Sequence, residues 1–378
     1  MNLGLCEQRF AIQRRPSFVA HQYYIAGQSG GISGSLTSPD AEAENPGDPP
    51  APAPTGDYIG TDDEDVSTSG CHPDNYKVGS VDMSQPVASP TPLDNGPNIS
   101  PCEEYPTNIL DEAASIGTPP IEDWQYIAHA DNSIWAAPLG VAHLWKAYNN
   151  DPNKAVEPFA VDPDAEDFVL NITGSTNPPP NPARPIAALT YITPCIHESD
   201  HPQLKGTDDG PQWLAWVLNA IGDSQFWSSS VIFVVWDDWG GFYDNVPAPT
   251  PFRPANNKYG NPDDPNEWGF RVPLIVISPY LKERGFISSQ ATSGFQYRSQ
   301  SVILQYIEAT FGLPSLGTDD FQNNQSDGLR DMFNYGNQPL AWADIPNTFT
   351  PGTVGSCPGA GGAYRRAYFH GKKKAAHH

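Results

Sequence analysis

The sequence predicts an α/β protein built on a mainly parallel sheet flanked by helices. Three short apolar runs, 186–192, 231–236 and 271–277, are rich in β-branched and aromatic residues. Such runs are typical of strands that are buried on both faces, as in parallel sheets. Segments with helical periodicity alternate with strand-like runs along the chain, which is the order expected when helices connect parallel strands.

Four strands and four helices are expected in the clearly patterned part of the chain. The expected strands are 123–128, 186–192, 231–236 and 271–277. The expected helices are 107–114, 139–148, 209–221 and 301–311. We expect Asp209 to cap the third helix, with Pro211 in its first turn. Gly312 is expected to end the fourth helix.

Long loops rich in proline and glycine are expected around this core. The chain has 378 residues with 33 Gly and 41 Pro, and 29–106 is rich in Ser, Gly, Pro, Asp and Thr without a helical or strand period. We interpret 1–350 as a single domain with a loop excursion over 29–106. The remainder, 351–378, is Gly-rich and then basic, and is expected to be a flexible tail.

The charge balance excludes two classes of partner. Lys and Arg total 20 and Asp and Glu total 44, so the formal net charge is −24. This balance argues against a nucleic-acid binder or a protein of anionic membranes, because both need clustered basic charge. No apolar run is long enough to span a bilayer. The opening residues also lack the apolar segment of a signal peptide.

The five cysteines do not have the spacing of a metal site. They are Cys6, Cys71, Cys102, Cys195 and Cys357. No Cys-x-x-Cys pair and no Cys/His spacing typical of zinc is present, so a structural zinc site is not expected. A disulfide between Cys71 and Cys102 and free buried thiols are both compatible with the sequence.

Candidate chemistry follows two of the predicted strands, where parallel α/β sheets bind their ligands. The loop after 186–192 contains His197 and His201, and the loop after 231–236 begins with Asp237 and Asp238. Two adjacent carboxylates at the end of a buried strand are costly unless a cation neutralises them, which favours a metal site. The alternative is that Asp237 caps a turn and Asp238 faces water.

Several blocks of the sequence, in the same order, resemble the phosphoesterase family of phospholipases C and acid phosphatase A, part of the alkaline-phosphatase superfamily. The blocks are 16–22, 199–202, 213–221, 234–244, 269–280 and 301–320. The resemblance implies an alkaline-phosphatase-like fold. It also implies a secreted or periplasmic location.

The resemblance further implies a metal-dependent hydrolase of phosphate esters. Ser17 matches the nucleophile, which would form a phospho-enzyme, and His201 matches a histidine that stabilises charge on the transferring group. Asp237 and Asp238 match paired ligands of a divalent metal, which could be Ca²⁺, Mg²⁺, Mn²⁺ or Zn²⁺. His21, four residues after Ser17, is given a supporting role.

The sequence departs from the family pattern before the nucleophile. The family begins with a core strand that ends in a Glu-Asn pair, and no such strand is expected before Ser17. Asn245 stands where the family usually has His, and 297–300 lacks a further His. We therefore expect the N-terminal part of the domain to be missing, either because the sequence starts late or because this is a degenerate homologue.

The predicted substrate is a small phosphate mono- or diester or a phospholipid head group. The paired aspartates and Trp239 resemble the acid-phosphatase branch more than the Asp-Glu form common in phospholipases. The alternative function is that of an inactive homologue that binds phosphate or a partner without turnover. A third hypothesis, an acidic surface-binding module that uses 29–106, rests on composition alone.

Overall fold

The fold is described from a computed structural model of the chain. The described residues are 3–6, 9–11, 17–27, 78–79, 98–99, 108–114, 124–128, 135–150, 159–161, 165–174, 186–195, 198–201, 209–240, 242–246, 269–288, 298–317 and 328–351. Within the excursion 29–106, the structure describes only two short strands, β2 (Val78–Gly79) and β3 (Asn98–Ile99). Cys71, Cys102 and the tail after residue 351 also lie outside the described residues.

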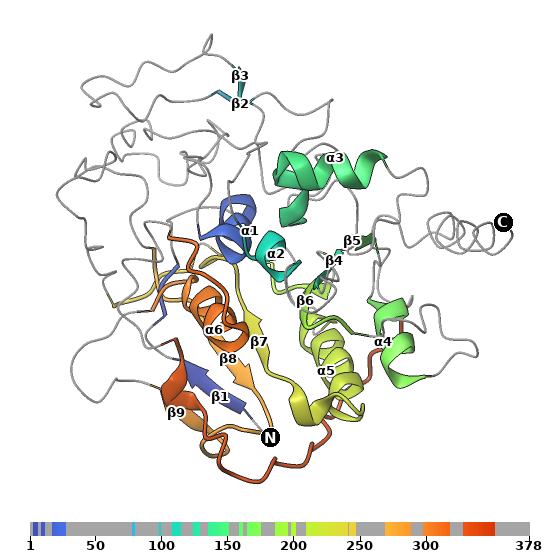
Figure 1. Cartoon of the computed structure of the whole chain (residues 1–378). Helices are drawn as coiled ribbons and strands as arrows, with labels where there is room; N and C mark the ends of the chain where they lie inside the picture. The colour runs from blue at the N-terminus through green and yellow to red at the C-terminus, as the bar shows by residue number, and fades with distance from the viewer. Residues whose placement is uncertain are drawn as a thin grey trace, which may run out of the picture.

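The larger sheet has four strands in the order β7-β8-β1-β9 (Figure 1). They are β7 (Ile232–Val235), β8 (Leu274–Ile277), β1 (Leu3–Cys6) and β9 (Phe286–Ser288). β8 is antiparallel to both of its neighbours, and β1 and β9 are parallel. This sheet is therefore mixed, and the prediction of a mainly parallel sheet is wrong for it. In the described residues no helix lies between β7 and β8, so the feature that favours parallel pairing is missing there.

The second sheet has three strands in the order β5-β4-β6, and here all pairs are parallel as predicted. The strands are β5 (Phe159–Val161), β4 (Trp124–Ala128) and β6 (Leu189–Thr193). Tyr126 of β4 lies opposite Tyr191 of β6 in the ladder. Helices in the connections between these strands account for the parallel arrangement.

The helices agree with most of the expected ranges. They are α1 (Ser17–Ala26), α2 (Ile109–Ala113), α3 (Ala142–Asn150), α4 (Glu166–Thr173), α5 (Asp209–Gly222) and α6 (Val302–Phe311), with 3-10 turns η2 (Ala137–Gly140), η4 (Trp227–Ser229) and η5 (Arg330–Met332). Asp209 is the first residue of α5 rather than its cap. Gly312 ends α6 with φ 68°, as expected of a glycine in the left-handed region.

Helices α5 and α6 cover opposite faces of β7. Ile232 and Val234 belong to the apolar cluster that contains Leu218 of α5, whereas Phe233 and Val235 pack against the cluster that contains Ile303 of α6. Because alternate strand residues point to opposite faces, β7 lies in a middle layer between two helices. No helix in the described part of the chain is long and apolar enough to cross a membrane.

The structure has a strand before Ser17 that the sequence analysis did not expect. β1 occupies an interior position of the larger sheet, between β8 and β9, and Leu3 pairs with Ile277. Its four residues include Gly4, and the segment is too short to show a reliable strand period. The expectation of no core strand before Ser17 is therefore wrong, although β1 does not end in a Glu-Asn pair.

Candidate functional site

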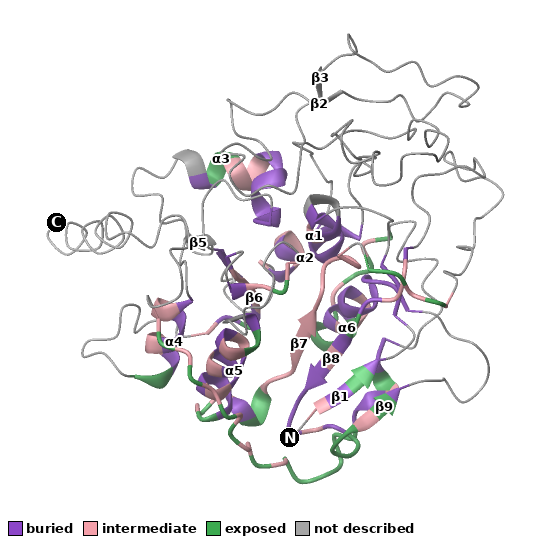
Figure 2. Ribbon diagram, turned by 180° about the vertical axis from the view of Figure 1, so that it is seen from behind, coloured by how far each residue is buried: buried purple, intermediate pink, exposed green. Residues whose placement is uncertain are grey.

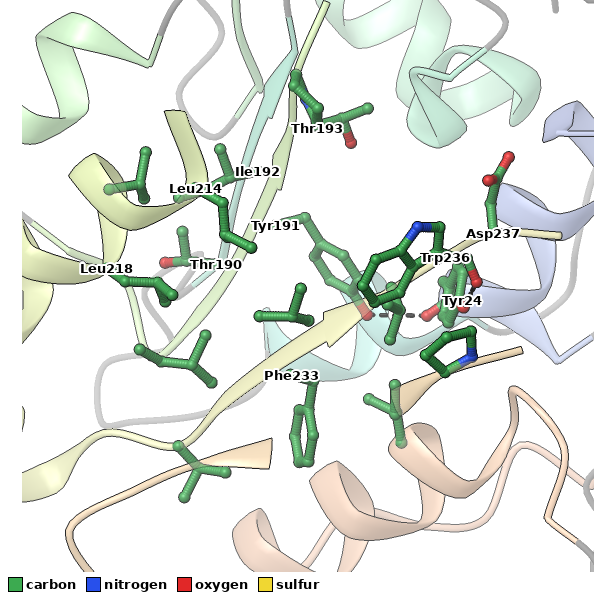
Figure 3. Close-up of a pocket in the computed structure, with 18 of the residues that line it drawn as sticks. Tyr24, Thr190, Tyr191, Ile192, Thr193, Leu214, Leu218, Phe233, Trp236 and Asp237 are labelled. Atoms are coloured by element: carbon green, nitrogen blue, oxygen red, sulfur yellow. Dashed lines mark hydrogen bonds between the residues drawn. The ribbon is translucent and has the colours of Figure 1, made fainter. Parts of the chain in front are cut away.

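A large cavity lies between β6 and β7 and reaches the N-terminal end of α1 (Figure 3). Its volume is about 2550 Å³. The predicted site residues Ser17, His201, Asp237 and Asp238 all line it, together with His21. The structure therefore brings to one cavity residues that lie more than 200 positions apart in the sequence. Their catalytic roles stay predictions.

Helix α1 brings Ser17 and His21 to this cavity. The two residues are one helical turn apart, so their side chains lie on one face of α1. Ser17 is buried and is the first residue of the helix. Free backbone N–H groups at a helix N-terminus attract anions, so the Ser17 end of α1 suits a phosphate group.

His21 faces Asp237 at the end of β7. Its Nε2 lies 3.7 Å from Oδ2 of Asp237, and its Nδ1 lies 3.5 Å from the hydroxyl of Tyr126. Both distances exceed those of a well-formed hydrogen bond, so the ring is near both groups without being tightly held by either. Burial lowers the pKa of His21, and the Asp237 carboxylate acts in the opposite direction.

Tyr126 forms the wall of the cavity beside His21. Its hydroxyl donates to the carbonyl of Trp135 at 2.8 Å and accepts from the hydroxyl of Thr193 at 3.2 Å. Burial raises the pKa of Tyr126 to about 12. The phenol therefore stays protonated near neutral pH and serves as a fixed hydrogen-bonding group.

His201 approaches Asp237 from the loop after β6. Its ring lies 5.9 Å from the ring of Trp135, and its buried Nδ1 has no hydrogen-bond partner among the residues that the structure describes. Burial lowers the pKa of His201, and Asp237 opposes this shift. Both histidines therefore lie within the field of one carboxylate. His197 lies outside the described residues.

The two neighbouring aspartates have different environments. Oδ1 of Asp238 accepts a hydrogen bond from the backbone N–H of Gly240 at 2.6 Å, and Gly240 has φ 62°. Asp238 therefore caps the turn after β7, while Asp237 faces the histidines. Further along, Asp244 accepts two hydrogen bonds from the guanidinium of Arg271, at 2.6 and 2.9 Å, which hold the pKa of Asp244 at about 2.

A buried polar layer that the sequence analysis missed holds the end of β7. The hydroxyl of Tyr24 donates to the carbonyl of Trp236 at 3.1 Å, and the side-chain amide of Gln300 donates to the carbonyl of Asp237. Arg9 is fully buried, donates to the Tyr24 hydroxyl and lies over the Tyr24 ring. These contacts fix the backbone that carries the Asp237 carboxylate. Nothing in the local sequence around Arg9 or Gln300 distinguishes them from surface residues.

The predicted metal site is incomplete in the described part of the chain. No group of three His, Cys, Asp or Glu side chains that could hold a metal ion occurs among the described residues. Asp237 offers a hard oxygen ligand beside His21, whereas one oxygen of Asp238 is already engaged by Gly240. These residues alone do not make a metal centre.

Comparison with known proteins identifies the segment that carries most of this site. Residues 184–314 match the sequence model of the Phosphoesterase family. The Non-hemolytic phospholipase C of Pseudomonas aeruginosa is 27% identical over 189 residues, covering 44% of this chain and 26% of that protein. Phospholipase C A of Mycobacterium tuberculosis is 28% identical over 169 residues, covering 42% of this chain and 31% of that protein.

A plant protein is similar over a shorter stretch. The Non-specific phospholipase C6 of Arabidopsis thaliana is 30% identical over 133 residues, covering 31% of this chain and 25% of that protein. The chain therefore spans only about a quarter to a third of the length of these relatives. The resemblance to the phosphoesterase family is confirmed for the segment from β6 to α6, which contains His201, Asp237 and Asp238.

Proposed function

We propose that this chain is a hydrolase of phosphoric ester bonds that acts in the cavity between β6, β7 and α1. The observation that carries the proposal is that Asp237 faces His21 and influences His201 in a cavity that Ser17 also lines. The match of residues 184–314 to the phosphoesterase family gives this arrangement its chemical interpretation.

In the proposed mechanism, Ser17 is the nucleophile. Its oxygen forms a bond to phosphorus while the ester P–O bond breaks and the leaving oxygen takes up a proton. Water later breaks the Ser17 Oγ–P bond, which releases phosphate from a monoester or a phosphate monoester from a diester. Burial favours the neutral form of His21, which can accept the serine proton from one turn along α1. His201 donates a hydrogen bond to the transferring group or to the leaving oxygen.

A divalent cation is also part of the proposal, with Asp237 and Asp238 as protein ligands. A bound cation would neutralise charge on the phosphoryl oxygens and lower the pKa of the nucleophile. Because the described residues do not complete its site, no step above is assigned to the metal. The alternative function is that of an inactive homologue that binds phosphate without turnover.

The proposed substrates are phosphate mono- and diesters, including phospholipid head groups. The relatives named above are phospholipases C, which favours a phosphodiester with a lipid leaving group. The acid-phosphatase preference suggested by Asp238 and Trp239 remains the competing prediction. An extracytoplasmic location is proposed as well. It is supported by the disulfide of Cys195, because disulfides persist mainly in oxidising compartments.

The test is hydrolysis of p-nitrophenyl phosphate and p-nitrophenylphosphorylcholine, with and without EDTA. Asp237→Asn is expected to lower kcat/KM by at least about 100-fold, the scale typical of lost acid–base or electrostatic catalysis. Asp111→Asn is the matched control, since Asp111 also faces a histidine, His143 at 3.0 Å, but lies outside the cavity lining.

The outcomes separate the two functions. Full activity of Asp237→Asn would refute the proposed site, and full activity in EDTA would refute the cation. Binding of inorganic phosphate by the unmodified chain with no turnover of either ester would instead establish the non-catalytic alternative. The melting temperature of each variant, measured alongside, shows whether a lost activity reflects loss of the fold.

A further inference from the structure

Two exposed aromatic side chains stand at the opening of the cavity. Phe242 is 68% exposed and Tyr243 is 83% exposed, the highest values among the large hydrophobic residues that the structure describes. Both residues also line the cavity. A side chain that lines a cavity and still meets solvent over most of its surface lies at the mouth of that cavity. Phe242 and Tyr243 therefore form part of its rim.

The loop that carries the two rings is fastened at both ends. Asp244 accepts hydrogen bonds from the guanidinium of Arg271 at 2.6 and 2.9 Å and from the backbone N–H of Arg271 at 3.3 Å. The N–H of Val246 donates to Oδ1 of Asp244 at 3.1 Å. Before the rings, the N–H of Phe242 donates to the carbonyl of Trp239 at 3.1 Å. The loop therefore presents its aromatic side chains from a fixed backbone.

Two further aromatic rings support the exposed pair. The ring of Tyr243 lies 5.7 Å from that of Phe270, and the ring of Trp239 lies 5.1 Å from the same ring. Both contacts are edge-to-face, an arrangement that aromatic rings favour. Trp239 and Phe270 are half-buried. We call Trp239, Phe242, Tyr243 and Phe270 the aromatic rim.

The charges beside the aromatic rim define the surface that it suits. Asp244 and Arg271 form an ion pair at 2.6 Å, so their charges offset each other. The whole chain has a formal charge of −24, which repels an anionic surface at long range. Trp and Tyr are enriched where the hydrocarbon of a membrane meets water. The aromatic rim therefore suits a lipid surface without net charge.

The aromatic rim is also close to the candidate catalytic residues. Asp238 is four residues before Phe242, so their backbones are at most about 14 Å apart. Apolar groups that bind in a membrane interface are buried about 5–10 Å into the boundary between head groups and acyl chains. A chain docked through the aromatic rim would hold the carboxyl end of β7 near the layer that contains the lipid phosphates.

We propose that the aromatic rim docks the mouth of the cavity on a zwitterionic lipid surface, that of phosphatidylcholine. This inference rests on the proposed function, because a hydrolase of phospholipid esters takes its substrate from a lipid aggregate. The exposed rings of Phe242 and Tyr243 enter the interface, and the fastened loop keeps the cavity open toward the head groups. The surface that the rim contacts is thus the one that contains the substrate.

The first experiment measures binding of the full 378-residue chain to large unilamellar vesicles of phosphatidylcholine by sedimentation. The combined change of Phe242→Ser and Tyr243→Ser is expected to weaken binding at least about tenfold, because two aromatic rings no longer leave water. Ile287→Ser is the matched control, since Ile287 is 52% exposed but does not line the cavity. It belongs to β9, at the other end of the strand order from β7, and Figure 2 shows that β9 is partly exposed. The control is expected to bind like the unmodified chain.

Three measurements on the unmodified chain do not depend on the variants. Hydrogen exchange is expected to slow at the amides of 242–246 in the presence of phosphatidylcholine vesicles and to stay unchanged at 286–288. Replacing part of the phosphatidylcholine with phosphatidylglycerol is expected to weaken binding, because the negative surface repels the negative chain. Soluble phosphorylcholine is expected to leave vesicle binding unchanged, because the rim contacts the surface and not a single head group.

Several results would overturn the proposal. Absence of binding to phosphatidylcholine vesicles, or equal binding by the double variant and the unmodified chain, would refute docking through the aromatic rim. Stronger binding to vesicles that contain phosphatidylglycerol would assign the contact to the basic residues of 365–374. Displacement by phosphorylcholine would assign it to a head group held inside the cavity.

The docking surface and the proposed function can fail separately. Vesicle binding needs no turnover, and hydrolysis of p-nitrophenylphosphorylcholine needs no lipid surface. Binding through the rim without hydrolysis of the soluble ester would support the docking surface and refute the hydrolase. Hydrolysis of the soluble ester without vesicle binding would support the hydrolase and refute the docking surface.

Discussion

His21 and His143 each face an aspartate, but they lie in different surroundings. The side chain of His21 is 13% exposed at the edge of the cavity, whereas that of His143 is 41% exposed on the surface of the molecule. A buried histidine is costly to protonate, so its neutral form is available as a proton acceptor. Under the proposed function, the buried pair is catalytic and the exposed pair is not.

The difference in burial between His21 and His143 leads to a prediction about activity. His21→Asn is expected to lower kcat/KM for p-nitrophenyl phosphate by about 100-fold or more, as loss of a general base does. His143→Asn removes a histidine from a similar pair and is expected to leave the rate unchanged. Steady-state kinetics of the two variants measure this difference in kcat/KM. If both variants keep full activity, His21 has no role in the chemistry.

Single residues also show which parts of the candidate site could be predicted from the sequence. Ser17, His201 and Asp237 were predicted from sequence blocks that resemble the phosphoesterase family, and the three residues line one cavity. Tyr24 and Gln300, which hold the end of β7, were missed. Tyr24 bonds to a backbone carbonyl about 210 residues away in the sequence, and Gln300 to one about 60 residues away. Such contacts form only when the chain folds, so no local sequence pattern predicts them.

At the scale of elements, apolar runs predicted the strands β6, β7 and β8. Whether the relative direction of neighbouring strands was predicted correctly depended on the segments that connect them. Helices α3 and α4 lie between β4 and β6, and that pair is parallel as predicted. β7 and β8 were expected to be parallel because the sequence predicted a mainly parallel sheet. Their connection shows no helix in the described residues, and the two strands are antiparallel. Strand identity is thus a local property, whereas strand direction depends on what connects the strands.

A buried carboxyl group on helix α6 leads to a prediction about how stability depends on pH. Glu308, in its last turn, is buried, and its Oε1 accepts a hydrogen bond from the backbone N–H of Leu316 at 3.0 Å. Burial raises the pKa of Glu308 to about 7. The folded state therefore holds this proton more tightly than the unfolded state. The contribution of Glu308 to stability is greatest below about pH 4.5 and declines as the pH rises to about 7.

Glu308→Gln keeps the acceptor for Leu316 and removes the ionisation. The variant is expected to be more stable than the unmodified chain by about 2 kcal/mol at pH 8, with little difference at pH 4.5. Urea unfolding at the two pH values measures this. Glu283→Gln, on an exposed turn, is the control for the loss of a surface charge. An equal effect of Glu308→Gln at both pH values would contradict the proposed ionisation.

At the scale of the whole molecule, the sequence predicted the elements better than their assembly. The unit from β6 to β7 follows from its pattern, but the separation of the strands into two sheets does not. Apolar runs specify that a strand is to be buried, without naming the neighbour that buries it. At β7 these two levels disagree, because its apolar run is typical of a strand covered on both faces, yet all four of its residues are only half-buried.

The net charge of −24 is expected to affect how charged substrates reach the cavity. An anionic substrate is repelled at long range, and salt reduces this repulsion because the screening length falls from about 30 Å at 0.01 M to about 10 Å at 0.1 M. Over this range kcat/KM for p-nitrophenyl phosphate is therefore expected to rise about two- to tenfold. The zwitterionic p-nitrophenylphosphorylcholine has no net charge and should change little. If the rate for the anionic ester instead falls with added salt, positive charge near Asp237 dominates the local field, as a bound cation would produce.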